Sequence, residues 1–346
     1  MTSAGIGDAH TLMAAEIAEA PAAVARLLDA NASAAAALGR RLRDTPPDVV
    51  VTVARGSSDH AATYGKYLIE TMIGVPVASA APSVASIFAA PVATRRALAL
   101  AISQSGRSPD LIAAAQAQRA GGATLAALVN DEGSPLAAAA DTLLPLRAGP
   151  ERSVAATKSC IAAMAGLAQL VAAWAEDADL AAALATLPDR LAAAVALDWS
   201  GAVEAFAGVE RMFVIGRGYG LGVAGEAALK LKETCGIQAE AFSAAEVRHG
   251  PMTIVGEGFP VLAFAHGDPA GDDVRDVSAL FAGRGATVLL AQAGTLAGTL
   301  PAFAGHPALE PLMMLASFYG LAERLSRRRG HDPDRPPHLA KVTQTR

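Results

Sequence analysis

The sequence predicts an α/β protein with two tandem domains, each a doubly wound parallel sheet flanked by helices. Three observations predict it. Short apolar runs typical of strands alternate with helical stretches, polar glycine-containing loops follow the runs, and the same order recurs in the second half. A chain of 346 residues is long enough for two domains with their own cores. Because crossovers between parallel strands are right-handed, each strand–loop–helix unit adds a strand to one parallel sheet.

The first half begins with a helix and continues with strand–loop–helix units. Apolar residues recur at helical spacing over residues 13–43, and Pro46 and Pro47 end this predicted helix. The β-branched apolar run at residues 48–54 is typical of a strand buried on both faces. The remaining elements predicted here are a helix ending near Ile73, strands at 98–102 and 123–129, and a helix at 109–120.

The second half repeats this order. Strands are predicted at residues 211–215 and 261–265, and helices at 226–234 and 272–281. Residues 284–290 (Arg-Gly-Ala-Thr-Val-Leu-Leu) echo residues 121–127 (Gly-Gly-Ala-Thr-Leu-Ala-Ala), which we interpret as an internal duplication.

These elements predict four segments. They are an N-terminal helical segment (1–45), a first, phosphate-binding domain (46–195), a second domain (196–335) and a C-terminal tail (336–346). The alanine-rich stretch 176–208 should be helical and bridge the domains. The prolines after residue 330 predict an extended tail rather than a helix.

The composition restricts the function. The net charge of −5 lacks the basic field of a nucleic-acid binder, so no nucleic-acid partner is expected. Cys160 and Cys235 stand outside any CxxC or Cys/His cluster, so the sequence suggests buried thiols and no metal site.

The sequence also gives an expectation for the compartment. Residues 1–10 lack the basic and apolar regions of a signal peptide. The most apolar window, 160–175, is shorter than a membrane span and is interrupted by Gln169, which favours a buried helix. With low cysteine usage, this predicts a cytoplasmic protein with no membrane partner.

Clustered hydroxyl groups follow the first two predicted strands. Ser57 and Ser58 follow one strand, and Ser103, Ser105 and Ser108 follow the next. Ligands of open parallel sheets lie beyond the carboxyl ends of strands, where amides at helix N-termini attract anions. Two such adjacent loops predict a phosphate cradle; the alternative is that these serines only cap helices.

The corresponding loop of the second half has different chemistry. His266-Gly267-Asp268-Pro269 replaces Ser103-Gln104-Ser105-Gly106. Its carboxylate would repel a phosphate, so we expect one main phosphate site, formed by the first half.

Several motifs resemble the sugar isomerase (SIS) domain family. Residues 103–108 resemble its S-Q-S-G-x-[ST] phosphate loop. Residues 226–233 (Glu-Ala-Ala-Leu-Lys-Leu-Lys-Glu) and 239–251 are similar to the isomerase half of glucosamine-6-phosphate synthase. Residues 13–21 resemble the start of that half, and Leu339-Ala340-Lys341 its C-terminus. The resemblance covers nearly the whole chain in order.

The resemblance also implies an activity. No glutamine-hydrolysing domain precedes Met13 and no N-terminal cysteine nucleophile is present, so the sequence resembles stand-alone SIS-type glucosamine-6-phosphate deaminases. These release ammonia and fructose 6-phosphate, with no cofactor. The alternatives are another phosphosugar isomerase or deglycase of the family, and a non-catalytic sugar-phosphate sensor.

The resemblance implies roles for individual residues. Glu233 would be the base that moves the C2 proton to C1, and His249 would open the sugar ring. His249 comes from the neighbouring subunit in the family, which implies a homodimer. Lys230 and Lys341 would also be catalytic. The substrate-binding set would be Gly56, Ser57, Ser58, Ser103, Gln104, Ser105 and Ser108.

Other interpretations remain for these charged residues. Lys230, Lys232 and Glu233 could form a solvated helix face, and Arg217 could contact substrate or be a surface charge.

Three positions depart from the synthase pattern. Arg55 replaces a cysteine, Asp59 a tyrosine, and Ala156 a serine that contacts the sugar. These differences bear on the substrate more than on the fold.

Overall fold

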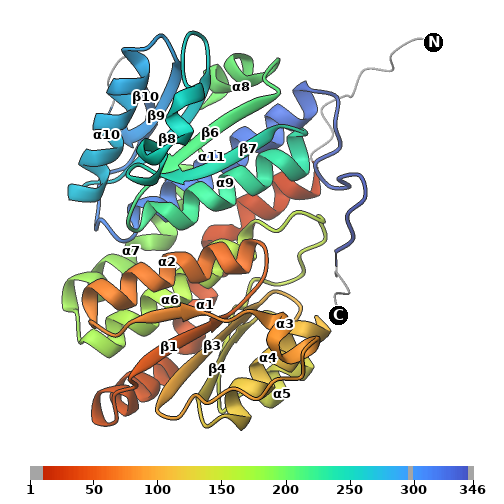
Figure 1. Ribbon diagram of the computed structural model, residues 1–346, viewed down its shortest axis with the longest axis vertical. Helices are drawn as coiled ribbons and strands as arrows, with labels where there is room; N and C mark the ends of the chain where they lie inside the picture. The colour runs from red at the N-terminus through yellow and green to blue at the C-terminus, as the bar shows by residue number, and fades with distance from the viewer. Residues whose placement is uncertain (1–10, 295–298, 342–346) are drawn as a thin grey trace.

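Two five-stranded parallel sheets form the framework of the protein, one in each half of the molecule (Figure 1). The structure, a computed structural model, describes residues 11–294 and 299–341. The strand order is β2-β1-β3-β4-β5 in the first sheet and β10-β9-β8-β6-β7 in the second. The predicted fold of two doubly wound parallel sheets is confirmed.

The strands of the first sheet are β1 (Val49–Val53), β2 (Val77–Ser79), β3 (Ala97–Ser103), β4 (Thr124–Val129) and β5 (Thr142–Pro145). Those of the second are β6 (Arg211–Gly216), β7 (Gln238–Ser243), β8 (Pro260–Ala265), β9 (Thr287–Ala293) and β10 (Thr299–Ala302). Strand β3 is buried at every position, and β1, β4, β6 and β8 at every position but the first. Burial on both faces explains the continuous apolar runs in these strands.

The helices cover both faces of each sheet. Those of the first half are α1 (Leu12–Asp44), α2 (Ser57–Met72), α3 (Pro82–Ser86), α4 (Pro109–Ala120), α5 (Pro135–Ala139) and α6 (Lys158–Ala175). Those that follow are α7 (Ala178–Val195), α8 (Ser200–Phe206), α9 (Gly220–Cys235), α10 (Pro269–Ala282) and α11 (Glu310–Arg328), with short 3₁₀ turns η1 (Glu246–His249) and η2 (Pro251–Ile254).

The two sheets share one topology. In each, the chain runs first to one side and then returns to add strands on the other side, so the direction reverses between β1 and β3 and between β6 and β8. Strands β4 and β9 also begin alike, since Gly122 and Gly285 adopt positive φ angles of 105° and 83° two residues before them. This correspondence supports the predicted internal duplication.

Helices α2 and α9 pack against each other between the sheets (Figure 1). They run antiparallel, because Ser57 at the start of α2 lies near Lys230 on α9, while Thr71 near its end is 2.9 Å from the Tyr219 hydroxyl. Two glycines of α9 allow this approach. A Cβ atom at Gly222 would lie 2.4 Å from the His60 carbonyl oxygen, and one at Gly225 2.6 Å from its Nδ1.

Helix α6 lies in the core. It is long and apolar enough to cross a membrane, yet 83% of its residues are buried inside the protein. A core helix meets the same criteria of length and composition, so the predicted buried helix is confirmed.

Other predicted segments differ in detail. The helix expected at residues 226–234 begins earlier, at Gly220, because the glycines there pack against α2. The alanine-rich stretch 176–208 forms α7 and α8. The tail contains turns, but no helix or strand among residues 330–341. Residues 1–10 and 342–346 of the predicted terminal segments lie outside the described residues, and the domain boundaries stay a prediction.

Candidate active site

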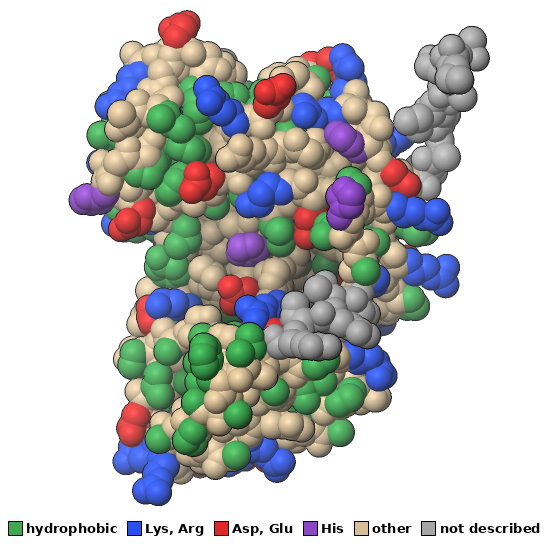
Figure 2. Space-filling view, turned by 45° about the vertical axis from the view of Figure 1, so that its right-hand side comes forward, with side chains coloured by type: hydrophobic (Ala, Val, Ile, Leu, Met, Phe, Trp, Pro, Cys, Tyr) green, Lys and Arg blue, Asp and Glu red, His purple; other side chains and the backbone are tan. Residues whose placement is uncertain are grey.

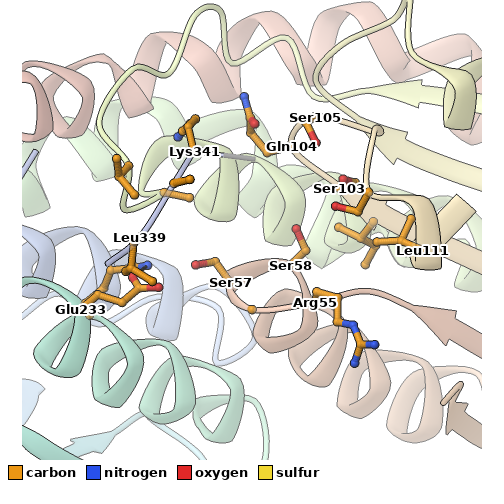
Figure 3. A pocket seen from close by; sticks show the side chains of 17 residues that line it. Arg55, Ser57, Ser58, Ser103, Gln104, Ser105, Leu111, Glu233, Leu339 and Lys341 are labelled. Carbon is orange, nitrogen blue, oxygen red and sulfur yellow. Dashed lines mark hydrogen bonds and ion pairs between the residues drawn. The ribbon is translucent and has the colours of Figure 1, made fainter. Parts of the chain in front are cut away.

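A pocket of about 290 Å³ opens at the carboxyl edge of the first sheet, where the strand order reverses (Figure 3). We call it the first pocket. Doubly wound sheets bind ligands at this switch point. Its walls are the loops after β1 and β3, the loop before α6, the second half of α9 and the C-terminal tail. Of the predicted residues, it brings together Gly56, Ser57, Ser58, Ser103, Gln104, Ser105, Ser108, Lys230, Glu233 and Lys341.

The predicted phosphate cradle faces the open space of the first pocket. Helices α2 and α4 begin at the pocket, and neither Gly56 nor Ser108 caps its helix with a side chain. Ser103 Oγ accepts a hydrogen bond from Gly106 N (3.0 Å), and Ser105 Oγ accepts one from Arg107 N (3.3 Å). These bonds orient the hydroxyls and use their acceptor side, so their hydrogens can be donated to phosphate oxygens.

Arg55 joins the two loops of the cradle. Its Nε and Nη2 donate to the Asp110 carboxylate at 3.1 and 2.8 Å, and this carboxylate is fully buried at the start of α4. In Figure 3 the guanidinium group points away from the serines. The arginine that departs from the synthase pattern therefore fixes the cradle from behind.

A buried ion pair stands across the pocket from the serines. Lys230 Nζ lies 2.5 Å from Glu233 Oε2, and the lysine side chain is 1% exposed whereas that of Glu233 is 21% exposed. Burial lowers the pKa of Lys230, but the carboxylates of Glu226 and Glu233 outweigh it and raise the pKa to about 12. Lys230 is thus a fixed cation, and the alternative of a solvated helix face is excluded for it.

Glu226 is a residue that the sequence analysis did not single out. It is fully buried, accepts a hydrogen bond from the Tyr319 hydroxyl (2.9 Å) and lies 3.5 Å from Lys230 Nζ. Burial raises its pKa to about 7, opposed by Lys230 and by the nearby Tyr319 and Ser57 hydroxyls. It links the cradle to the Lys230–Glu233 pair. Its i, i+4 spacing to Lys230 was the available signal.

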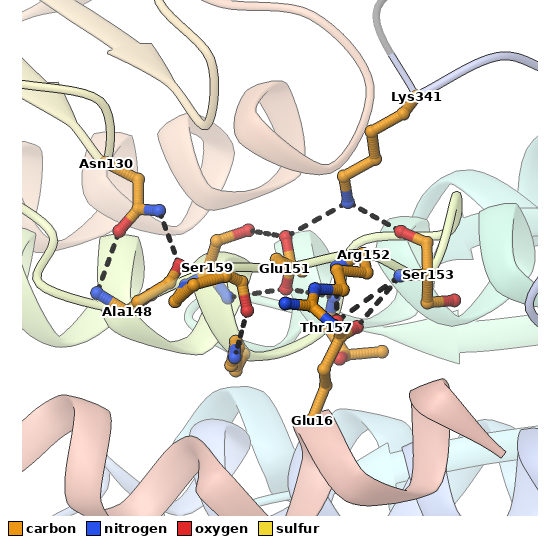
Figure 4. A network of polar contacts seen from close by, with 12 residues as sticks. Glu16, Asn130, Ala148, Glu151, Arg152, Ser153, Thr157, Ser159 and Lys341 are labelled. Carbon is orange, nitrogen blue, oxygen red and sulfur yellow. Dashed lines mark hydrogen bonds and ion pairs between the residues drawn. The ribbon is translucent and has the colours of Figure 1, made fainter. Parts of the chain in front are cut away.

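Three carboxylates organise the loop before α6, which carries Ala156 into the pocket (Figure 4). Glu16 accepts hydrogen bonds from the Arg152 and Ser153 amides, and Glu19 pairs with Lys158. The third, Glu151, accepts bonds from the Thr157 and Ser159 amides, both at 3.1 Å. The glutamates at the start of α1 therefore shape the wall of the first pocket that Ala156 lines.

The C-terminal tail closes one side of the first pocket. Lys341 Nζ donates to the Ser153 carbonyl oxygen at 2.6 Å and lies 3.5 Å from Glu151 Oε2 (Figure 4). Further back, the Asp334 carboxylate accepts bonds from the Leu12 and Met13 amides, both at 2.7 Å. Lys341 is thus held at the pocket by its own contacts with the loop before α6 and by the contact of Asp334 with the start of α1.

His249 does not join the other candidates. It lies in η1 with an exposed side chain, and it is not among the residues lining the first pocket of this chain. Its contribution from a neighbouring subunit stays a prediction. Lys232 also points elsewhere, donating to the Ala239 carbonyl oxygen at 3.1 Å.

Charged side chains of both signs gather along the waist between the two halves (Figure 2).

Within residues 11–294 and 299–341, no group of three His, Cys, Asp or Glu side chains is placed to hold a metal ion.

Comparison with known families shows to which family the chain belongs. Residues 46–173 and 205–296 match the family described as "SIS domain". This chain belongs to the SIS domain family. The match covers both halves, so the SIS domain occurs twice, in tandem, as the motifs predicted.

Curated relatives of this SIS protein include isomerizing aminotransferases that are longer than this chain. It is 36% identical over 314 residues to a glutamine–fructose-6-phosphate aminotransferase (isomerizing) from Symbiobacterium thermophilum, covering 84% of this chain and 51% of the relative. An enzyme of the same name from Methanothermobacter thermautotrophicus is 35% identical over 306 residues, covering 84% and 50%. The chain spans about half the length of these relatives.

Solved structures share the whole architecture. A candidate phosphosugar isomerase from Silicibacter pomeroyi DSS-3 is 46% identical with a TM-score of 0.89, covering 94% of this chain and 100% of that one. The C-terminal domain of glucosamine-fructose-6-phosphate aminotransferase from Francisella tularensis is 26% identical (TM-score 0.85; 96% and 100% covered). Glucosamine-6-phosphate deaminase from Thermotoga maritima, 20% identical with a TM-score of 0.78 over 97% of this chain and 100% of that one, shares the fold. A phosphosugar ligand and isomerase-type chemistry are therefore features of this family.

Proposed function

We propose that the protein is an isomerising glucosamine-6-phosphate deaminase, which converts glucosamine 6-phosphate and water into fructose 6-phosphate and ammonia. The observation that carries this proposal is the placement of Glu233 and the serine cradle on opposite walls of the first pocket. A ligand with a phosphate at one end and a reacting carbon at the other fits this arrangement.

The cradle would hold the phosphate of the sugar. Hydroxyls of Ser57, Ser58, Ser103, Ser105 and Ser108 and the uncapped N-termini of α2 and α4 favour a dianion without a lysine in the loop. The Gln104 amide lines the same wall. Anchoring at the phosphate leaves C1 and C2 to reach toward α9.

Glu233 would act as the base in the isomerisation. After the ring opens, its carboxylate removes the C2 proton and returns it to C1, which converts the aldose to a ketose imine through an enol-type intermediate. Lys230 keeps its proton, because its pKa is raised to about 12, and so it stabilises negative charge rather than moving protons. Lys341 lies at the edge of the same pocket, within reach of the open chain.

Ammonia would leave after the isomerisation. Water adds to the imine carbon C2, the carbon–nitrogen bond breaks, and the nitrogen departs with the protons of the amine and water, leaving the C2 carbonyl of fructose 6-phosphate. The relatives support this choice, since their name joins fructose 6-phosphate, amino transfer and isomerisation in one enzyme.

We further propose a cytoplasmic homodimer in which His249 of one subunit opens the sugar ring at the site of the other. His249 is exposed and does not line the first pocket of its own chain, which is consistent with this.

One measurement tests the activity. Purified protein is incubated with glucosamine 6-phosphate, and ammonia and fructose 6-phosphate are measured together; equal amounts of both are expected. Conversion of glucose 6-phosphate to fructose 6-phosphate, without ammonia from the amino sugar, would instead identify a plain isomerase. Binding of both phosphosugars without turnover would identify the sensor.

A further inference from the structure

The second sheet has a cavity at the place that corresponds to the first pocket. Its volume is about 350 Å³, and it lies beyond the ends of β6 and β8, where the strand order of the second sheet reverses. We call it the second pocket. Arg217, Tyr219 and Asp268 line it from the loops of the second half, and Tyr67 and Thr71 line it from α2 of the first half. It has the size and the position of a ligand site in this fold class.

The second pocket is closed to phosphate. Asp268 accepts a hydrogen bond from Gly271 N at 2.9 Å, so its carboxylate already occupies the N-terminus of α10. The same carboxylate lies 2.8 Å from His266 Nδ1. In the first pocket Ser108 makes no side-chain cap on the equivalent helix, α4. The Asp110 carboxylate of α4 accepts a bond from Leu111 N at 2.8 Å, but it is paired with Arg55 and does not line the pocket. A phosphate entering here would meet the fixed negative charge of Asp268, which itself lines the pocket.

The lining of the second pocket suits a neutral polar ligand. One anion, Asp268, and one cation, Arg217, line it, and the arginine is paired with Asp273. The remaining polar groups are hydroxyls: Tyr219 and Thr71 lie 2.9 Å apart, and Tyr67 and Ser243 complete the set. Tyrosine offers an apolar ring face beside a hydroxyl, the combination that fits the alternating faces of a sugar ring.

We propose that the second pocket is a ligand site for a hexose that carries no phosphate. Its position gives it a connection to the active site. Helix α2 runs from Ser57 in the first pocket to Thr71 in the second, and α9 runs from Tyr219 in the second to Glu233 in the first. Bound sugar would therefore contact both helices of the pair that carries the proposed catalytic groups.

Calorimetric titration of the whole protein with D-glucose tests the site directly, without turnover. Glucose binding in the millimolar range is expected for wild type. Ala270→Phe, which places a ring in the second pocket, should abolish the binding, and Thr71→Ala, at an exposed position, should weaken it about fivefold by removing one hydrogen bond. Circular dichroism and thermal unfolding establish that each variant is folded.

Ser105→Ala in the first pocket is the matched control. It should leave glucose binding unchanged and weaken the binding of fructose 6-phosphate. The two second-pocket variants should reduce glucose binding and leave the binding of fructose 6-phosphate unchanged. Three results would each overturn the proposal: no glucose binding by wild type, glucose affinity that neither Ala270→Phe nor Thr71→Ala changes, or inorganic phosphate that binds wild type and is lost in Ala270→Phe. Since only binding is read, the result stands apart from the deaminase assay.

Discussion

The switch points of the two sheets have the same backbone topology and opposite electrostatics. At the first, helices α2 and α4 begin without side-chain caps, beside a group of serines. At the second, Asp268 caps α10 and faces His266. Strand order places each pocket, and the side chains that line it, serines in one and Asp268 in the other, set the charge that a ligand would meet.

The largest effect on turnover is expected from Glu233, a carboxylate of the first pocket that has no counterpart in the lining of the second. Glu233→Gln should lower the turnover of glucosamine 6-phosphate by about a thousandfold or more, because the base is lost, while phosphosugar binding changes little. Ammonia release and calorimetry measure the two quantities. Glu240→Gln, an exposed carboxylate of the same domain, serves as the control. Full turnover by Glu233→Gln would remove this residue from the mechanism.

Exchanging the residues at the two helix N-termini should weaken the contrast between the pockets. Ser108→Asp places a carboxylate where the cradle faces the phosphate, and it should weaken fructose 6-phosphate binding at least about 100-fold, since facing like charges costs several kcal/mol. In the mirror variant Asp268→Ser, serine still caps α10, and weak phosphate binding should appear at the second pocket. Calorimetric titration measures the phosphosugar affinity of Ser108→Asp and the phosphate affinity of Asp268→Ser. An unchanged phosphosugar affinity in Ser108→Asp would contradict phosphate binding at the serine cradle.

A smaller effect tests the helix pair that joins the two pockets. Gly222→Ala should lower the free energy of unfolding by about 2 kcal/mol, because its Cβ would lie 2.4 Å from the His60 carbonyl oxygen and push α2 from α9. Gly201→Ala is the matched control, since a Cβ there meets nothing within 4 Å and alanine favours the helix. Urea unfolding compares the two, and equal stabilities would argue against tight packing at Gly222.

The last prediction concerns pH and the buried carboxyl of Glu226. Burial raises its pKa from 4.5 to about 7, so between these values the unfolded chain has lost the proton that the folded protein keeps. The free energy of unfolding therefore falls as pH rises through this interval. Glu226→Gln should lack this decline, so its stability relative to wild type should rise from pH 4.5 to 7.

The stability of wild type must be compared with that of Glu226→Gln at each pH, because His60 also titrates in this range. Burial lowers its pKa from 6.5 to about 4, and its contribution to stability is lost as pH falls through that range, opposite in direction to that of Glu226. Unfolding free energies of wild type and Glu226→Gln are therefore measured at each pH and subtracted. If the difference in unfolding free energy between the two proteins does not vary with pH, Glu226 is not the group that titrates.

Much of the fold was predictable because its signals are local. Continuous apolar runs predicted the buried strands β1, β3, β4, β6 and β8. Pro46 and Pro47 marked the end of the first helix, which ends at Asp44. The short edge strands β2 and β10 carried no such run, and α9 begins among glycines that favour a helix only when packed against α2.

The candidate site was predictable where it follows strands and family motifs. The serines and the Lys230–Glu233 spacing indicated the first pocket. Glu151 could not be found this way, because its importance comes from burial and from a partner far apart in sequence, Lys341. Glu226 stood in the family motif four residues before Lys230, but its burial and its bond to Tyr319 depend on the fold. The tie between Arg55 and Asp110 likewise joins two loops that only the fold brings together.

Each pocket draws its loops from one half of the chain and its facing helix from the other, which has an evolutionary consequence. A single-domain ancestor that paired through the α2–α9 contact would have needed two copies to complete any site, and the dimer would have held two identical ones. Joining the copies in one gene frees each site to change alone, so a fused enzyme can keep one for chemistry and let the other acquire a new ligand.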